Sequence, residues 1–225
     1  MRIGILQTGH APEAIRPETG DYSDMFKRLF AGEDFDFITY DVVDGLFPDG
    51  AEAEEGWIIT GSRHGAYEDH DWIPPLETLI RDIAASKRPL LGICFGHQII
   101  AQALGGKVEK FRGGWSVGRQ AYDFGDAKLN LNAWHQDQVV ELPPEGVAIA
   151  QSDFCKNAAM VVGKSILTVQ PHPEFDRAVV AGLIEHRSDA VPTELVDQAR
   201  ATLTSPTDNA EMAARMAGFL KKGAK

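Results

Sequence analysis

A cysteine stands where an apolar stretch of the chain, Leu90–Ile93, ends and a helix is expected to begin. Cys94 lies between Gly92 and Gly96, and a Gly-x-Cys-x-Gly pattern at a strand-to-helix turn is typical of a nucleophile elbow. The glycines lack the Cβ atoms that would clash where strand and helix approach closely. The helix N-terminus would favour a thiolate, and the backbone N–H of Phe95 is free to bind an oxyanion. The pattern predicts a nucleophilic thiol, with a buried core cysteine as the alternative.

A histidine and a glutamate that suit such a thiol follow another apolar stretch, Ser165–Gln170. His172 and Glu174 alternate with Pro171 and Pro173, which hold the backbone extended. Side chains at i and i+2 of an extended chain point the same way, so Glu174 could accept a hydrogen bond from Nδ1 of His172. Nε2 would then face the thiol. This predicts a Cys–His–Glu site at the carboxyl ends of parallel strands, and the alternative is an ordinary surface loop.

The elements that must position these residues alternate between strand and helix along the first half of the chain. Helices are expected at 21–31, with Ser23 as N-cap, and at 74–87 and 97–104. Strands are expected at 2–7, 35–43, 57–59 and 89–93. Such alternation favours parallel strands joined by right-handed helical crossovers.

The second half of the chain changes character. Short strands separated by turns are expected at 108–111, 119–124, 138–142, 147–151, 158–162 and 166–170, and helices from 176 onward with breaks at Pro192 and Pro206. The fold class is therefore α/β, with an open, mostly parallel central sheet flanked by helices, added antiparallel strands and C-terminal helices. We predict one domain at 1–225, made of a catalytic core at 1–175 and a helical C-terminal extension at 176–225.

The composition narrows the class of protein. Lys plus Arg total 22 and Asp plus Glu total 33, and the net charge of −11 argues against nucleic acid or an anionic membrane as partner. The one basic cluster, Lys221, Lys222 and Lys225, is expected to be a solubilising tail. The chain shows no signal peptide, no membrane-spanning apolar run and only two cysteines, so we expect a cytoplasmic protein. Cys155 has no elbow around it and is expected to be inert.

These motifs resemble the class I (triad) glutamine amidotransferase family, across residues 1–175. The segments that carry the resemblance are Gly92-Ile93-Cys94-Phe95-Gly96-His97-Gln98, Pro171-His172-Pro173-Glu174 and Ile59-Thr60-Gly61-Ser62. The resemblance implies a flavodoxin-like fold, with Cys94 as nucleophile, His172 as general base and Glu174 as the carboxylate that orients it. It also implies residues that bind the substrate. Backbone N–H groups of Phe95 and of the Gly61–Ser62 turn would bind the oxyanion, and Gln98 would contact the bound glutamine. The segment that holds Trp134, Gln136 and Asp137 would bind the α-amino and α-carboxylate groups of that glutamine.

Further segments resemble the stand-alone branch of that family, which includes γ-glutamyl peptidases and glutamine amidotransferase-like proteins. They are Gly61-Ser62-Arg63-His64, Phe95-Gly96-His97-Gln98-Ile99-Ile100, Gly113-Gly114-Trp115-Ser116-Val117-Gly118 and Trp134-His135-Gln136-Asp137-Gln138-Val139. The resemblance implies cysteine-dependent hydrolysis of a γ-glutamyl amide bond, in glutamine or in a γ-glutamyl peptide or amine, through a γ-glutamyl thioester. No synthase domain is recognisable after Glu174, so hydrolysis is favoured; the alternative is a glutaminase that delivers ammonia to a separate synthase partner.

The loop at 64–71 is rich in side chains that can bind metals, but their spacing matches no recognised ligand pattern. The sequence favours a solvated loop over a lid beside the oxyanion turn and over a metal site. In a lid, Arg63 could pair with a substrate carboxylate. We therefore expect no metal and no organic cofactor.

Overall fold

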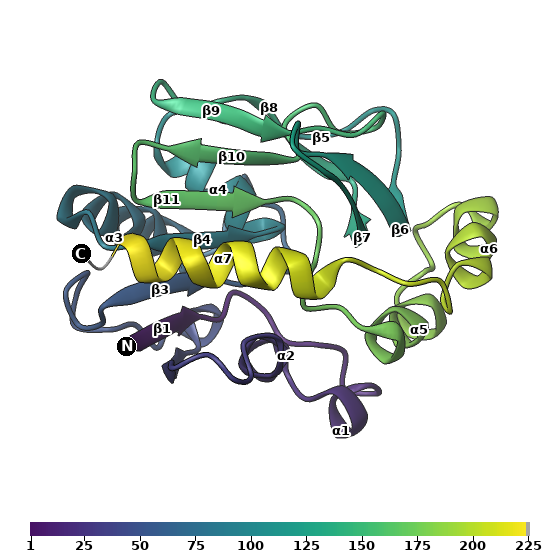
Figure 1. Ribbon diagram of the computed structural model, residues 1–225, viewed down its shortest axis with the longest axis horizontal. Coiled ribbons are helices and arrows are strands. Elements are labelled where there is room, and N and C mark those ends of the chain that lie inside the picture. Colours follow the sequence, from purple (N-terminus) through teal and green to yellow (C-terminus); the bar gives the residue numbers. More distant parts are fainter. Residues whose placement is uncertain (224–225) are drawn as a thin grey trace.

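The computed structural model describes residues 1–223 and is built around a seven-stranded sheet (Figure 1). From β2 to β11 neighbouring strands pair parallel, and β10 and β9 are added antiparallel. In spatial order the strands are β2 (Asp36–Tyr40), β1 (Arg2–Leu6), β3 (Gly56–Ile59), β4 (Leu90–Ile93), β11 (Ile166–Val169), β10 (Ala159–Val162) and β9 (Gly146–Ala150). The predicted mostly parallel sheet with added antiparallel strands is confirmed.

Two antiparallel pairs lie outside this sheet. They are β5 (Lys107–Lys110) with β8 (Asp137–Glu141), and β6 (Ser116–Asp123) with β7 (Lys128–His135). An isolated bridge between Asn132 and His172 ties β7 to the segment after β11. The second pair thereby reaches the carboxyl end of the main sheet.

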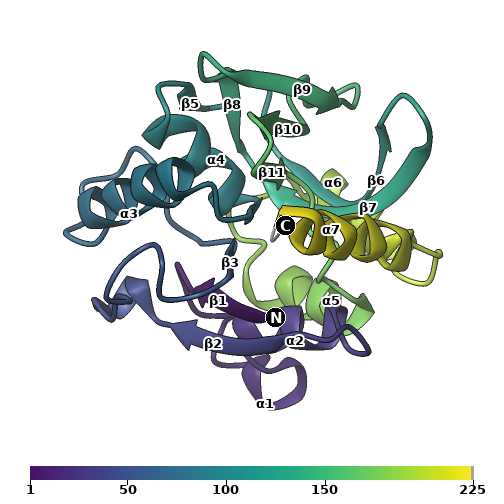
Figure 2. The ribbon, with the colours of Figure 1, turned by 60° about the vertical axis from the view of Figure 1, so that its left-hand side comes forward.

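Helices cover both faces of the sheet. They are α1 (Arg16–Thr19), α2 (Tyr22–Leu29), α3 (Ile73–Ser86), α4 (Phe95–Ala103), α5 (Arg177–His186), α6 (Thr193–Ala201) and α7 (Asn209–Gly223), with a short 3-10 turn at Val42–Asp44. Figure 2 shows α3 and α4 on one side and α2 and α7 on the other. Among residues 1–223 no helix has both the length and the apolar character needed to cross a membrane.

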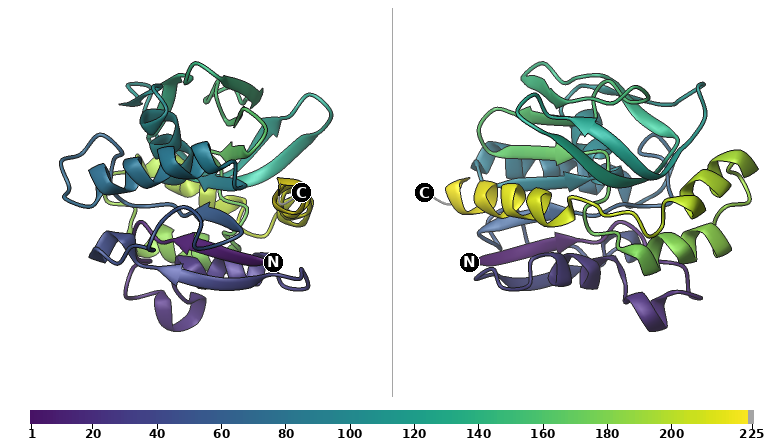
Figure 3. Two further views of the ribbon diagram at one scale, coloured as in Figure 1. Left: turned by 90° about the vertical axis from the view of Figure 1, so that its left-hand side faces the viewer. Right: turned by 45° about the vertical axis from the view of Figure 1, so that its right-hand side comes forward.

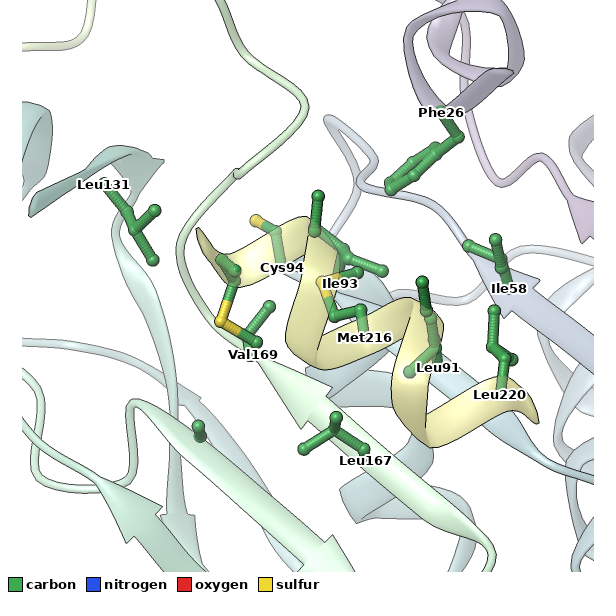
Figure 4. Packing of buried hydrophobic residues seen from close by; sticks show 14 of the residues in the cluster. Phe26, Ile58, Leu91, Ile93, Cys94, Leu131, Leu167, Val169, Met216 and Leu220 are labelled. Atoms are coloured by element: carbon green, nitrogen blue, oxygen red, sulfur yellow. The ribbon is translucent and has the colours of Figure 1, made fainter. Parts of the chain in front are cut away.

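The alternation of side chains along the strands divides the core between these faces. On one face Ile3 and Ile5 of β1 pack in a cluster with Met216 and Leu220 of α7. On the other, Leu6 packs in a cluster with residues of α3 and α4. Figure 4 shows the α7 side chains lying over strand residues that include Leu91, Ile93 and Val169, with Cys94 beside them. The C-terminal helix α7 is therefore part of the main core.

The sequence prediction of the local structure needs several corrections. Helix α1 was not expected, and the strand expected at 35–43 ends at Tyr40, before the 3-10 turn. Asp21, and not Ser23, is the N-cap of α2, since its side chain and that of Asp24 form a reciprocal capping box, while the Ser23 N–H donates to Gln7. Strand β7 was not expected at all, although Leu129, Leu131 and Ala133 alternate with polar residues as a half-buried strand should. The basic cluster near the C-terminus is only partly described, because Lys225 lies outside residues 1–223.

Helices α5 and α6 lie beyond the carboxyl ends of the parallel strands (Figure 3). Strands β1, β3, β4 and β11 all end at this edge, at Leu6, Ile59, Ile93 and Val169. Open parallel sheets place their ligand sites here, because the loops that follow the strands converge at this edge. The two motifs singled out in the sequence follow β4 and β11 at this edge.

Candidate active site

Cys94 lies in the tight turn between β4 and α4. Its backbone has φ 54° and ψ −101°, a left-handed conformation that costs a non-glycine residue about 1–3 kcal/mol. A Cβ on Gly92 would lie 2.6 Å from the carbonyl oxygen of Gly96, and a Cβ on Gly96 would lie 2.4 Å from that of Ile59. Both distances are shorter than any stable contact, so the turn depends on the two glycines.

Gly96→Ala is expected to lower the free energy of unfolding by about 1–3 kcal/mol or more, because the new methyl group meets the backbone of β3. Gly218→Ala is the matched control, since no atom lies within 4 Å of a Cβ at that position of α7. Alanine there should leave stability unchanged or raise it by up to about 1 kcal/mol. Urea denaturation measures both variants, and equal stabilities would contradict this description of the turn.

Two stretches of backbone lie next to the Cys94 side chain, at the start of α4 and at Gly61. The N–H of Phe95 is the first of α4, and the first N–H groups of a helix have no partner within it. A Cβ on Gly61 would lie 2.8 Å from Cε1 of His172 and 3.8 Å from Cβ of Cys94, so this loop packs its backbone against both side chains. The N–H of Gly96 donates to the carbonyl of Thr60 at 3.1 Å, which fixes the loop to the helix.

His172 and Glu174 meet as their spacing predicts. Nδ1 of His172 lies 2.7 Å from Oε1 of Glu174, and both side chains are buried. The His172 N–H donates to the carbonyl of Asn132 in β7 at 2.8 Å. The Phe175 ring stacks on the imidazole, with centroids 3.8 Å apart and planes 6° apart. The imidazole is therefore held by a carboxylate at its edge and by an aromatic ring on its face.

The charges around His172 favour its protonated form. Burial alone would lower its pKa, but the carboxylate of Glu174 and the sulfur of Cys94 outweigh burial and raise the pKa to about 10. The imidazole is then positive at neutral pH. A positive imidazole beside a thiol stabilises the thiolate, which is the form that attacks carbonyl carbon.

The two cysteines should differ sharply in reactivity toward iodoacetamide. Cys94 lines a cleft, whereas Cys155 is 1% exposed and burial raises its pKa to about 12. At pH 7 we expect Cys94 to be alkylated at least about 100-fold faster, because the thiolate is the reacting form. Mass mapping of timed samples measures both rates, with Cys94→Ser protein as the control for Cys155. Equal slow rates would contradict an activated thiol at Cys94.

The cleft over Cys94 and His172 has a volume of about 340 Å³. It is lined by most of the residues that the sequence assigned to substrate binding, namely Ser62, Gln98, Trp134, Gln136 and Asp137. The other two, Gly61 and Phe95, are not among its lining residues: the backbone at Gly61 packs against His172 and Cys94, and the Phe95 side chain packs into the core against Trp72. The structure thus brings five of the seven assigned residues around one space.

Gln98 lines the cleft, and its amide nitrogen has two partners within the protein. Its Nε2 donates to the carbonyl of Asp137 at 2.9 Å and to Oε1 of Gln170 at 3.1 Å. The amide nitrogen is therefore used to hold the backbone of Asp137, and only the carbonyl end remains for a ligand. The Asp137 carboxylate accepts from the hydroxyl of Tyr67 at 3.1 Å, and burial raises the pKa of this carboxyl.

Several side chains that line the cleft were not assigned from the sequence, and three of them carry polar groups that matter for a ligand. These three are Tyr67, Lys110 and Arg187, which come from a loop, from the end of β5 and from the end of α5. Together with Arg63, Lys110 and Arg187 give the cleft three Arg or Lys side chains, beside the carboxylates of Glu68 and Asp137. The three cationic side chains suit a ligand that carries carboxylates. No local motif marks these residues, because they converge only in the folded chain.

Comparison with known proteins defines the family. The family model "Glutamine amidotransferase class-I" matches residues 55–180, which hold both the cysteine elbow and the histidine segment. The chain belongs to the class I glutamine amidotransferase family. The resemblance inferred from the motifs is therefore confirmed at the level of the family.

Two relatives and one solved structure extend this result. The chain is 30% identical to gamma-glutamyl peptidase 3 of Arabidopsis thaliana, over 85% of this chain and 84% of that protein. It is 33% identical to a subunit of the glutamine-hydrolyzing GMP synthase of Methanopyrus kandleri, over 55% of this chain and 68% of that protein. A glutamine amido transferase from Methylobacillus flagellatus has the same fold, with a TM-score of 0.76 and 21% identity over 100% of this chain and 95% of that one.

Proposed function

We propose that this protein hydrolyses a γ-glutamyl amide bond, in glutamine or in a γ-glutamyl peptide or amine, with Cys94 as nucleophile. The observation that carries the proposal is the strained cysteine beside an imidazole whose Nδ1 lies 2.7 Å from a buried carboxylate. A thiol, an imidazole and a carboxylate in this order would supply the nucleophile, base and orienting group that acyl transfer requires. Substrate, enzyme residues and water suffice for the reaction.

In the first half of the reaction the Cys94 thiolate attacks the γ-carbonyl carbon. The N–H groups of Phe95 and of the Gly61–Ser62 turn bind the oxyanion, and loss of one such donor typically costs about 10²–10³ in rate. Protonated His172 gives its proton to the amide nitrogen, the C–N bond breaks, and the amine leaves. The γ-glutamyl group is then bound to sulfur as a thioester, and His172 is neutral.

In the second half water replaces the amine. Neutral His172 accepts a proton from water as the oxygen attacks the thioester carbon. The C–S bond breaks, and glutamate leaves as the γ-carboxylic acid, which then loses its proton to solvent. The thiolate and the protonated imidazole are restored, and Glu174 keeps the same tautomer and orientation of His172 through both steps.

The remaining cleft residues would bind the glutamyl end of the substrate. We assign the α-amino and α-carboxylate groups to the segment Trp134–Asp137, whose backbone at Asp137 is held by Gln98. The cationic side chains Arg63, Lys110 and Arg187 would face carboxylates of the substrate. A leaving group that carries a carboxylate, as in a γ-glutamyl peptide, fits this charge better than ammonia does.

The similarity to a gamma-glutamyl peptidase, over more than four fifths of both chains, supports hydrolysis by the isolated protein. The similarity to one subunit of a GMP synthase supports a second candidate, a glutaminase that passes ammonia to a separate synthase. The two candidates share their chemistry and differ in the acceptor.

Release of glutamate by the purified chain distinguishes them. We expect turnover of a γ-glutamyl dipeptide without any partner, at least about tenfold faster in kcat/KM than turnover of glutamine. The Cys94→Ala protein is the control for contaminating activity. A chain that hydrolyses neither compound alone but gains glutaminase activity with a co-purified partner would favour the second candidate.

A further inference from the structure

Three side chains of the loop after Gly61 converge at the rim of the cleft. Nε2 of His70 lies 2.8 Å from Oε2 of Glu68, and Nδ1 of His64 lies 3.4 Å from the same oxygen. All three ligand atoms lie within 4.8 Å of one another. We infer that His64, Glu68 and His70 bind a divalent transition-metal ion of the Zn²⁺ type.

The donor set selects the kind of ion. Two imidazole nitrogens and one carboxylate oxygen suit Zn²⁺, Co²⁺ or Ni²⁺, whereas Mg²⁺ and Ca²⁺ prefer oxygen ligands alone. Ligands about 2.0–2.2 Å from a tetrahedral zinc ion lie roughly 3.3–3.6 Å from one another. The 3.4 Å contact falls within this range, the 2.8 Å contact is shorter, and the two imidazole nitrogens lie within 4.8 Å of each other, so small rotations of the side chains would complete the site. Both imidazoles now lie against the same oxygen of Glu68. A metal ion bound between the three ligand atoms would replace the ring protons that make these contacts.

A buried aromatic residue holds the two imidazoles in place. Trp72 stacks on His70, with centroids 5.9 Å apart and planes 11° apart, and its ring lies edge-on to His64 at 5.8 Å. Trp72 itself is 9% exposed and packs against Phe95, the residue after Cys94. The backbone N–H of His64 also donates to Oγ of Ser62 at 3.2 Å. The donors are therefore pre-positioned, which lowers the entropy lost when an ion binds.

An ion at this cluster would be accessible from solvent and would lie beside the cleft over Cys94. The side chains of His64, Glu68 and His70 are 18%, 44% and 33% exposed, so solvent reaches all three. His64 and Glu68 line the same cleft as Cys94. Three protein ligands would leave a fourth position for water or for a donor in the cleft. The ion would also fix the loop that forms this wall of the cleft.

Zinc titration by calorimetry tests the inference on full-length Cys94→Ser protein, in which the active-site thiol cannot compete as a ligand. We expect one Zn²⁺ per chain with a Kd in the micromolar range, and a visible absorption band of tetrahedral Co²⁺ in a parallel titration. Because the readout is binding, its result does not depend on whether the proposed hydrolysis is correct.

Two further variants in that background locate the ion. Changes in the second shell of a metal already cost about 10–100-fold in affinity, so Glu68→Gln and His70→Ala should each weaken zinc at least tenfold. His186→Ala is the matched control, because His186 is also exposed and lies 3.9 Å from Glu185. Circular dichroism checks that each variant is folded. Zinc affinity that survives both Glu68→Gln and His70→Ala, or no binding at millimolar zinc, would overturn the inference.

Discussion

Cys94→Ala is expected to lower kcat/KM for a γ-glutamyl dipeptide by roughly 10⁴-fold or more, because the thiol that would form the acyl-enzyme is lost. Oxyanion donors and substrate-binding residues would remain and leave only the residual rate that binding and polarisation provide. Stopped assays of free glutamate with purified wild-type and variant protein measure the difference.

Cys155→Ala is the matched control for this substitution. Cys155 is equally a thiol, but it is buried in the core and does not line the cleft. We expect its replacement to change kcat/KM by no more than a few-fold and to act mainly on stability. Retention of substantial activity in Cys94→Ala, or an equal loss in both variants, would contradict the assignment of the nucleophile.

Glu174→Gln is expected to lower kcat by about 10⁴-fold while the fold is retained. In the wild-type structure Nδ1 of His172 lies 2.7 Å from Oε1 of Glu174. The glutamine amide of the variant can present its NH₂ group to Nδ1 in place of an oxygen. The imidazole would then turn or take the wrong tautomer, and the positive charge beside Cys94 would be lost. A loss below tenfold would show that Glu174 is not the group that orients His172.

The same variant has a pH-dependent effect on stability. The pKa of His172 is raised to about 10 in the folded protein, from an ordinary value near 6.5. A group with a raised folded pKa contributes stability fully below its unfolded pKa and loses it as the pH rises through the folded pKa. The difference in free energy of unfolding between wild type and Glu174→Gln should therefore be largest near pH 6 and decline toward pH 10. A difference that grows between pH 6 and pH 10 in urea denaturation would contradict the ion pair.

Local patterns predicted the parts of the fold whose causes are local. The elbow at Cys94 is set by its two glycines, and the approach of Glu174 to His172 follows from two extended residues between prolines. Strand β7 was missed despite its alternation, because the asparagines and the histidine in it weaken the apolar signal. The sequence placed the N-cap of α2 at Ser23 instead of Asp21, because both residue types are good caps. The choice between them depends on a contact of the Ser23 N–H with Gln7, the residue that follows β1.

The rest of the cleft could not be predicted because it depends on tertiary structure. Lys110 and Arg187 are separated along the chain from Cys94, and only the packing of β5 and α5 brings them to one wall. The imidazoles of His64 and His70 both pack against Trp72, which in turn packs against Phe95. Spacing in the loop alone gave no sign of that convergence.

Partitioning by hydroxylamine tests the central claim most directly. A γ-glutamyl thioester on Cys94 can be attacked by hydroxylamine as well as by water, whichever half of the reaction is slower. We predict that the purified protein, given a γ-glutamyl dipeptide and hydroxylamine, forms γ-glutamyl hydroxamate at the expense of glutamate, and that Cys94→Ala forms neither. Undiminished glutamate release with no hydroxamate would mean that water attacks the substrate directly, and it would contradict catalysis through a thioester on Cys94.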